Sequence, residues 1–192
     1  MKAGGGNDLA IVHFSGHGAL VDGNLYLLPF GIDARDDVGI KTSGLVIDEL
    51  RGELLELAKY GRVLVLLDAC HSGATTMNGA TLAMNSTALR GALAATNVTV
   101  LTSSSGSQVS REDAAWQHGA FTKALLDAFN DSAADINHNS LISPNGLAEY
   151  VTTRVSSLTD GAQTPGMETR NDMTLFATGF GQQISTTLPD SR

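Results

Sequence analysis

Two continuous apolar runs constrain what this chain can fold into. The run Val63-Leu64-Val65-Leu66-Leu67 has no polar residue to turn toward water, which is typical of a strand covered on both faces of a parallel sheet. The shorter run Leu9-Ala10-Ile11-Val12 predicts a second buried strand within residues 9–14. Because helices usually cover both faces of such a sheet, these runs favour an α/β fold.

Helical patterns and further strands alternate with these runs. Ile47, Leu50, Leu54 and Leu57 recur at helical spacing and predict a helix over residues 48–60. The remaining predictions are a hairpin around Asp22-Gly23-Asn24 within 19–30, strands at 98–101 and 173–177, a helix from Phe121 to Phe129, a helix capped by Ser143-Pro144, and irregular segments at 31–44, 71–96 and 103–118. Strands that alternate with helices predict a mainly parallel sheet.

Composition bounds the class of protein. The 192 residues suit one domain, which we expect over residues 8–180, with a linker or truncated edge at 1–7 and a tail at 181–192. The net charge of −8, from 12 basic and 20 acidic residues, argues against nucleic acid as a partner. The single cysteine excludes an internal disulfide framework and favours a cytoplasmic location. No apolar stretch approaches the length of a membrane span, so no membrane partner is expected.

The residues after the two apolar runs carry the chemistry. His17 lies in His13-Phe14-Ser15-Gly16-His17-Gly18, and Cys70, the only cysteine, lies in Asp68-Ala69-Cys70-His71-Ser72-Gly73. Ligand crevices of parallel sheets open where the strands end. An imidazole that takes the proton of a thiol makes a sulfur nucleophile for attack on a carbonyl. Taken singly, the cysteine could equally be a small buried hydrophobe and the histidine a polar turn residue, with His13 a plain strand residue.

The two motifs together resemble those of the caspase-like cysteine proteases, most closely the metacaspases and the bacterial orthocaspases. His17 precedes Cys70 by 53 residues, near the roughly fifty-residue offset known for caspases. Three further stretches strengthen the resemblance, which spans roughly residues 8 to 178: Tyr26-Leu27-Leu28-Pro29, Gly119-Ala120-Phe121-Thr122 and Ala162-Gln163-Thr164-Pro165.

The resemblance implies a three-layer sandwich with helices on both faces of the sheet, and a role for each matching residue. His17 is the expected base and Cys70 the nucleophile, while the backbone N–H groups of Gly18 and Cys70 form the oxyanion hole. Ser15 and Asp68 are expected to line an acidic S1 pocket, because a carboxylate there pairs with a basic P1 side chain. The expected substrate is a peptide or protein cut after Arg or Lys. Asp68 as a turn or capping residue at the strand end is the alternative.

The chain also departs from the family. A strand-helix-strand unit that precedes the His strand in relatives has no match, so we expect a further segment or a partner chain to supply it. The acidic cluster of the metacaspase calcium site is not obvious either, since Asp33, Asp36 and Asp37 are loosely placed. The segment from Asp135 to Ser143 resembles the first half of an EF-hand loop but lacks its glycine and its final glutamate. No cofactor is assured, and calcium stays an open alternative.

Self-cleavage is a further expectation. Arg90, followed by Gly91, is the one basic residue between Ala74 and Asn97, a segment whose small polar residues predict an accessible backbone. We therefore expect an autoprocessing site after Arg90, with Lys41 as the next candidate and a solvated loop charge as the alternative. Rival functions are a non-catalytic caspase-like scaffold, a CHAT-type caspase-like effector protease within a larger complex, and a calcium-binding module.

Overall fold

The computed structural model centres on three parallel strands, β1 (Asp8–Val21), β4 (Gly61–Cys70) and β5 (Val98–Thr102). Three antiparallel strands extend this core, namely β2 (Asn24–Leu28), β3 (Leu45–Val46) and β9 (Gly166–Glu168). The order across the sheet is β3-β2-β1-β4-β5-β9. The structure describes residues 8–32, 35–70, 86–105, 108, 110–114, 116–130, 132–170 and 175–178.

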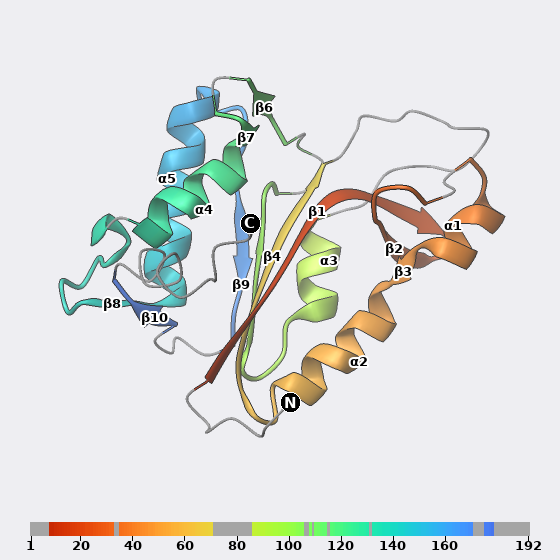
Figure 1. Cartoon of the computed structure of the whole chain (residues 1–192), viewed down its shortest axis with the longest axis horizontal. Coiled ribbons are helices and arrows are strands. Elements are labelled where there is room, and N and C mark those ends of the chain that lie inside the picture. Colours follow the sequence, from red (N-terminus) through yellow and green to blue (C-terminus); the bar gives the residue numbers. More distant parts are fainter. Residues whose placement is uncertain are drawn as a thin grey trace, which may run out of the picture.

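Helices and two small two-stranded sheets surround the central sheet (Figure 1). The helices are α1 (Asp37–Ser43), α2 (Ile47–Leu57), α3 (Ser86–Leu93), α4 (Ala120–Asn130), the 3-10 turn η1 (Ser132–Ala134) and α5 (Pro144–Thr159). The small sheets pair β6 (Glu112–Asp113) with β7 (His118–Gly119), and β8 (Leu141–Ile142) with β10 (Phe176–Ala177). Within the residues described, each helix is too short or too polar to cross a membrane.

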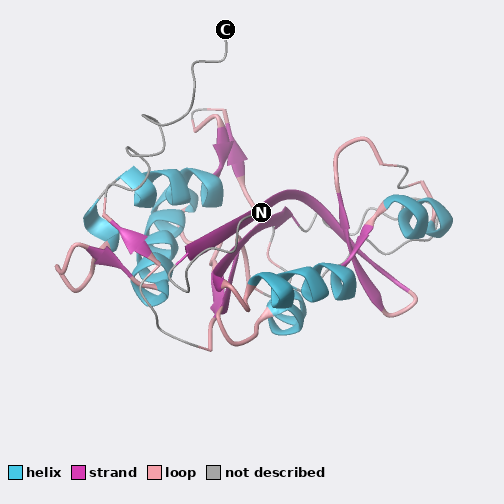
Figure 2. Cartoon of the chain, turned by 60° about the horizontal axis from the view of Figure 1, so that its bottom comes forward, coloured by secondary structure: helices cyan, strands magenta, loops and turns pink. Residues whose placement is uncertain are grey.

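The alternation of side chains along β4 divides the core in two. Val63, Val65 and Leu67 pack in one cluster with residues of α2 and α3, whereas Leu64 and Leu66 pack in another with residues of α4 and α5. Helices therefore lie on both sides of the strands, as the second view shows (Figure 2). The expected α/β sandwich with a mainly parallel sheet is confirmed, since β4 is buried on both faces as its apolar run predicts.

Most predicted elements are confirmed. The predicted hairpin is β1–β2, with Val21 paired to Asn24 and positive φ angles of 48° at Asp22 and 79° at Gly23. Such a two-residue turn needs positive φ at both positions, which Gly and Asp tolerate. The Ser143 hydroxyl accepts a hydrogen bond from the N–H of Gly146 at 3.1 Å, so the predicted cap begins α5.

Two segments predicted as irregular contain helices, and those predictions are wrong. Within 31–44, the Asp36 side chain accepts the N–H of Gly39 at 2.8 Å and begins α1, which buries Ile40. Within 71–96, α3 buries Leu89 and Leu93 one turn apart. Helices this short present too few apolar positions to establish a period, so neighbouring packing decides their formation. The rest of that connection, residues 71–85, lies outside the described residues.

The first half of β1 has one strand neighbour among the described residues. Residues 8–17 pair with β4, and the strand pairs with β2 only from His17 onward. The opposite edge from residue 8 to 16 is therefore unpaired within the described part of the chain, and Ile11 is 37% exposed there. The expected strand-helix-strand unit has no counterpart in that part. The predicted segments 1–7 and 181–192 lie outside it.

Candidate active site

The register between β1 and β4 brings the predicted catalytic residues together. His17 and Cys70 are Cα partners in this parallel ladder, and Ser15 and Asp68 are partners two residues earlier. Neighbouring strands lie about 4.8 Å apart, so both pairs are adjacent through their backbones. Gly18, predicted for the oxyanion hole, follows directly, is buried, and pairs with Leu27 of β2.

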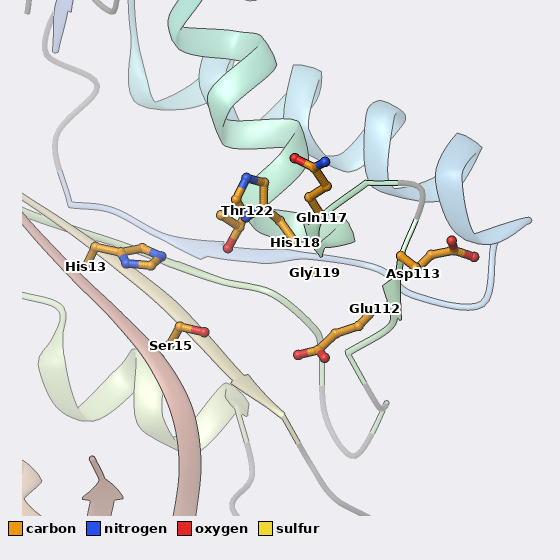
Figure 3. Close-up of a pocket in the computed structure, with 9 residues that line it drawn as sticks. His13, Ser15, Glu112, Asp113, Gln117, His118, Gly119 and Thr122 are labelled. Carbon is orange, nitrogen blue, oxygen red and sulfur yellow. The ribbon is translucent and has the colours of Figure 1, made fainter. Parts of the chain in front are cut away.

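One face of β1 presents polar side chains next to α4. His13, Ser15 and His17 share this face because strand side chains alternate, and all three are exposed. Leu66, the register partner of His13, packs in the same apolar cluster as Phe121 of α4, which identifies the face. The side chains of His13 and Ser15 project from β1 toward the start of α4 (Figure 3).

A cavity of about 620 Å³ opens between this face and the β6–β7 hairpin. β1, β6, β7 and the start of α4 supply its lining, which consists of His13, Ser15, Glu112, Asp113, Ala114, Gln117, His118, Gly119 and Thr122. Two of these lining residues, Glu112 and Asp113, are acidic, so the cavity suits a cationic group better than an anionic one. Ser15 is the one predicted pocket residue that lines it directly.

Asp68 lies directly behind the cavity wall. The side chain is 4% exposed, and its Oδ2 accepts a hydrogen bond from the hydroxyl of Thr122 at 2.8 Å. A Cβ atom at Gly119 would stand 3.0 Å from the same oxygen, so the backbone of β7 approaches the carboxylate closely. Asp68 is thus a residue within β4 whose carboxylate contacts Thr122 and Gly119, and it does not cap a turn. The Gly119-to-Thr122 motif has a physical reason, because its first and last residues both contact this carboxylate.

A buried amide anchors the β6–β7 hairpin. Gln163 is fully buried; its Oε1 accepts the N–H of Arg111 at 2.7 Å, and its Nε2 donates to the carbonyl of Ser103 at 2.7 Å. Arg111 immediately precedes β6, and its carbonyl accepts the N–H of Ala120 at 2.9 Å. The side chain therefore fixes the segment after β5 to the turn before β9. The Ala162-to-Pro165 motif marked Gln163 only by resemblance, and its hydrogen bonds explain why an amide stands there.

Sequence reasoning missed most of the cavity lining. His13 was interpreted as a strand residue, and Glu112, Asp113 and His118 fell within a segment predicted as an irregular loop. The sequence did hold a hint of this site, since the acidic residues Glu112 and Asp113 lie a few residues before the Gly119-to-Thr122 motif. A pair of carboxylates in a polar loop is nevertheless common on any surface, so spacing alone could not select it.

The predicted surroundings of Arg90 are wrong. Arg90 lies on α3, is 9% exposed, and donates from Nη1 to the hydroxyl of Thr102 at 2.8 Å. A Cβ atom at Gly166 would stand 2.0 Å from that nitrogen, so β9 closes over the guanidinium. Burial lowers the pKa of Arg90, and nearby Glu168 opposes that shift. A buried helical residue is a poor cleavage site, because a protease needs an extended, accessible backbone.

Lys41, the second cleavage candidate, also lies on a helix. Its ammonium forms an ion pair with Asp22 at the β1–β2 turn, and this hydrogen bond raises the pKa of Lys41. The bond after Lys41 is inside α1 rather than in the predicted loop.

The residues considered for calcium are used by the backbone around them. Asp135 is 6% exposed, and its two carboxylate oxygens accept the N–H groups of Asn139 at 3.1 Å and Ser140 at 2.6 Å. Asp36 caps α1, and Asp33 lies outside the described residues. Among the residues that the structure describes, no three His, Cys, Asp or Glu side chains gather as a metal site would require.

Fold and site together define an α/β protein with a His–Cys pair on neighbouring parallel strands. The chain matches the caspase domain family, a peptidase family, over residues 1–176, and it belongs to that family. No curated protein is similar enough to be matched to it. Among solved structures it resembles protein GSU0716 from Geobacter sulfurreducens, with a TM-score of 0.52 and 22% sequence identity over 93% of this chain and 73% of that one. At this identity the likeness concerns the fold.

Proposed function

We propose that the protein is a cysteine endopeptidase of the metacaspase or orthocaspase type, which hydrolyses peptide bonds after Arg or Lys. The observation that carries the proposal is the register of β1 and β4, which pairs His17 with Cys70 two residues after it pairs Ser15 with Asp68. Ser15 lines a cavity that also has Glu112 and Asp113 in its lining. Membership of the caspase domain family supports the same chemistry. A free thiol as nucleophile suits the reducing cytoplasm, where we place the protein.

In this mechanism the imidazole of His17 takes the proton of the Cys70 thiol, and the thiolate attacks the scissile carbonyl carbon. The oxyanion that forms accepts hydrogen bonds from the backbone N–H groups of Gly18 and Cys70. The imidazolium of His17 then gives its proton to the leaving amine as the C–N bond breaks, which leaves a thioester on Cys70. A water molecule, deprotonated by His17, attacks the thioester and releases the carboxylate product and the thiol.

The negative charge of the cavity supports cleavage after basic residues. Glu112 and Asp113 line the cavity, and Asp68 lies immediately behind Thr122 and Gly119. Among the described residues that line it, none is a lysine or an arginine. The chain as a whole carries a net charge of −8, which would favour the approach of a cationic peptide.

The experiment that tests this function compares paired variants on peptides with Arg, Lys or Asp at P1. Cys70→Ala should abolish cleavage of the Arg and Lys peptides, and His17→Asn should lower it at least about a hundredfold, since a general base contributes that much or more. His138→Asn makes the same exchange at an exposed histidine between η1 and β8 and should leave the rate unchanged. Cleavage by the Cys70→Ala protein, or equal cleavage after Asp and Arg, would contradict the proposal.

Two further measurements distinguish the scaffold and the CHAT-type alternatives from this proposal. A scaffold would leave Cys70 no more reactive than free cysteine toward an alkylating reagent, whereas an activated thiolate reacts faster at neutral pH. A CHAT-type effector would act only within its larger complex, so peptides would be cut only after its partners are added.

The unpaired edge of β1 fits the expectation of a further strand. We propose that a further segment of the protein, or a partner chain, pairs with residues 8–16, because an edge left open by the described strands invites association. Hydrogen exchange of the amides in this stretch tests it: amides facing the free edge should exchange rapidly in this chain and become protected when the covering strand is present.

A further inference from the structure

The carboxylates around the cavity differ in their access to it. Glu112 and Asp113 both line the cavity, whereas Asp68 does not and is 4% exposed. Figure 3 shows the carboxylate of Glu112 directed across the cavity toward Ser15, while that of Asp113 is directed away from it. A cation that entered between β1 and β6 would therefore meet Glu112 first.

Glu112 is also chemically available. Within the described residues its carboxylate takes part in no hydrogen bond or ion pair, and the side chain is exposed. Asp68, in contrast, already accepts the hydroxyl of Thr122 at 2.8 Å. A guanidinium could bind Glu112 without breaking an existing contact, but it would have to displace part of the wall to reach Asp68.

The backbone that carries Glu112 is held in place from two sides. Glu112 pairs with Gly119 in the β6–β7 ladder, and the preceding N–H, that of Arg111, donates to the buried Gln163 at 2.7 Å. Recognition residues act best when the surrounding structure fixes their position before the ligand arrives. An exposed carboxylate on a hairpin held in this way, with no partner among the described residues, is such an arrangement.

We propose that Glu112 is the residue that receives the basic P1 side chain, through a charge-assisted pair across the cavity from Ser15. Asp68 then acts from behind the wall, where it positions Thr122 and β7 and adds negative potential. This inference rests on the proposed peptidase function and assigns its substrate preference to a particular side chain.

The test uses three peptides that differ only at P1: Arg, Lys and citrulline, the neutral isostere of Arg. Glu112→Gln should lower kcat/KM for the Arg and Lys peptides about tenfold to a hundredfold, which is the range for the loss of a hydrogen-bonded charge pair. The effect should fall on KM. The citrulline peptide and the rate of Cys70 alkylation should be unchanged, because neither involves the charge of Glu112.

Glu53→Gln is the matched control, since it makes the same exchange at an exposed side chain of α2, a helix that packs on the opposite face of the sheet from the cavity. It should keep the ratio of Arg to citrulline cleavage within about twofold of the wild type, as for a surface exchange. An unchanged ratio in Glu112→Gln, or an equal loss in Glu53→Gln, would overturn the assignment to Glu112. Failure of the peptidase function itself is distinct, because the wild type would then cut none of the three peptides.

Discussion

Asp68 and Arg90 are both charged, both buried near the carboxyl ends of the central strands, and covered in different ways. The carboxylate of Asp68 is separated from the cavity by the hydroxyl of Thr122 and the backbone of Gly119. The guanidinium of Arg90 lies on the α3 side of the sheet, enclosed by Thr102, Ser104 and Gly166. Neither forms an ion pair with another described residue.

The difference teaches which buried charge can act on a ligand. A carboxylate separated from the cavity by one layer of side chains can still attract a cation that binds there. The guanidinium of Arg90, in contrast, is enclosed by α3 and β9, so it stabilises the surrounding structure and does not face a ligand. The residue predicted to be cut is thus a packing residue, and the one predicted to bind substrate lies beside the cavity.

The largest effect on stability is expected at the strand that closes over Arg90. Gly166→Ala places a Cβ atom 2.0 Å from Nη1 of Arg90, so the guanidinium has to shift away from its hydrogen bond with Thr102. We expect the free energy of unfolding to fall by about 2–3 kcal/mol, the upper part of the range for overpacking. Urea denaturation measures this loss. Adding Arg90→Ala should cost less in the Gly166→Ala background than in the wild type, and strict additivity would contradict the enclosure.

A loss of about 1–3 kcal/mol is expected from Gln163→Leu, because it leaves the N–H of Arg111 and the carbonyl of Ser103 without their partner. It should also raise KM for Arg peptides more than it lowers kcat, since β6 loses its anchor. Gln108→Leu is the control: its Oε1 accepts the N–H of exposed Thr164 at 2.9 Å. An unchanged KM in the Gln163→Leu protein would show that this amide does not position the cavity wall.

Asp68→Asn tests the other buried charge. The amide oxygen can still accept the hydroxyl of Thr122, so the wall should stay in place while the charge is lost. We expect the preference for Arg over citrulline to fall about threefold to tenfold, less than for Glu112→Gln, as the charge acts through the wall. The ratio of kcat/KM for the Arg peptide to kcat/KM for the citrulline peptide measures this preference. A larger loss than for Glu112→Gln would reverse the roles of the two acids.

The bond between Arg90 and Gly91 should resist cleavage in the folded protein, because α3 would have to unfold before the bond could enter an active site. Incubation of wild-type and Cys70→Ala protein, followed by N-terminal sequencing, gives the measurement. A wild-type fragment that begins at Gly91 under native conditions would show that α3 opens readily.

The smallest effect concerns Asp127 on α4, a partly exposed charge. Burial raises the pKa of Asp127, but hydrogen bonds from Lys123 and Arg154 outweigh it and lower the pKa overall. A lowered folded-state pKa adds stability above the unfolded pKa of about 3.9, and this is lost as pH falls through the folded value. We expect Asp127→Asn to cost less than about 1 kcal/mol at pH 7 and nothing near pH 2. An equal cost at both pH values would argue against an ionic contribution.

The sequence predicted the parts of this protein that depend on continuous local patterns. The apolar run at Val63–Leu67 predicted a buried central strand, and the motifs after the two runs predicted residues that the register then pairs. The short helices α1 and α3 were missed, because one or two buried turns establish no period.

The cavity could be predicted only in part. Ser15 and Asp68 were identified by family resemblance, but Glu112 depends on a hairpin of two short strands, β6 and β7, that lies across the cavity from β1. Such a contact between distant segments leaves no periodic signal in the sequence. The burial of Arg90 was missed for the same reason, since its partners Thr102 and Gly166 lie on two other strands.

The most direct test of the central claim is covalent labelling of Cys70 by peptidyl chloromethyl ketones that carry either Arg or Asp at P1. Intact-mass and peptide-mass spectrometry then locate the adduct. The account predicts one adduct on Cys70 with the Arg reagent, little or none with the Asp reagent, and much slower labelling of His17→Asn. Equal labelling by both reagents, or no adduct on Cys70, would contradict a His17-activated Cys70 beside a pocket for basic side chains.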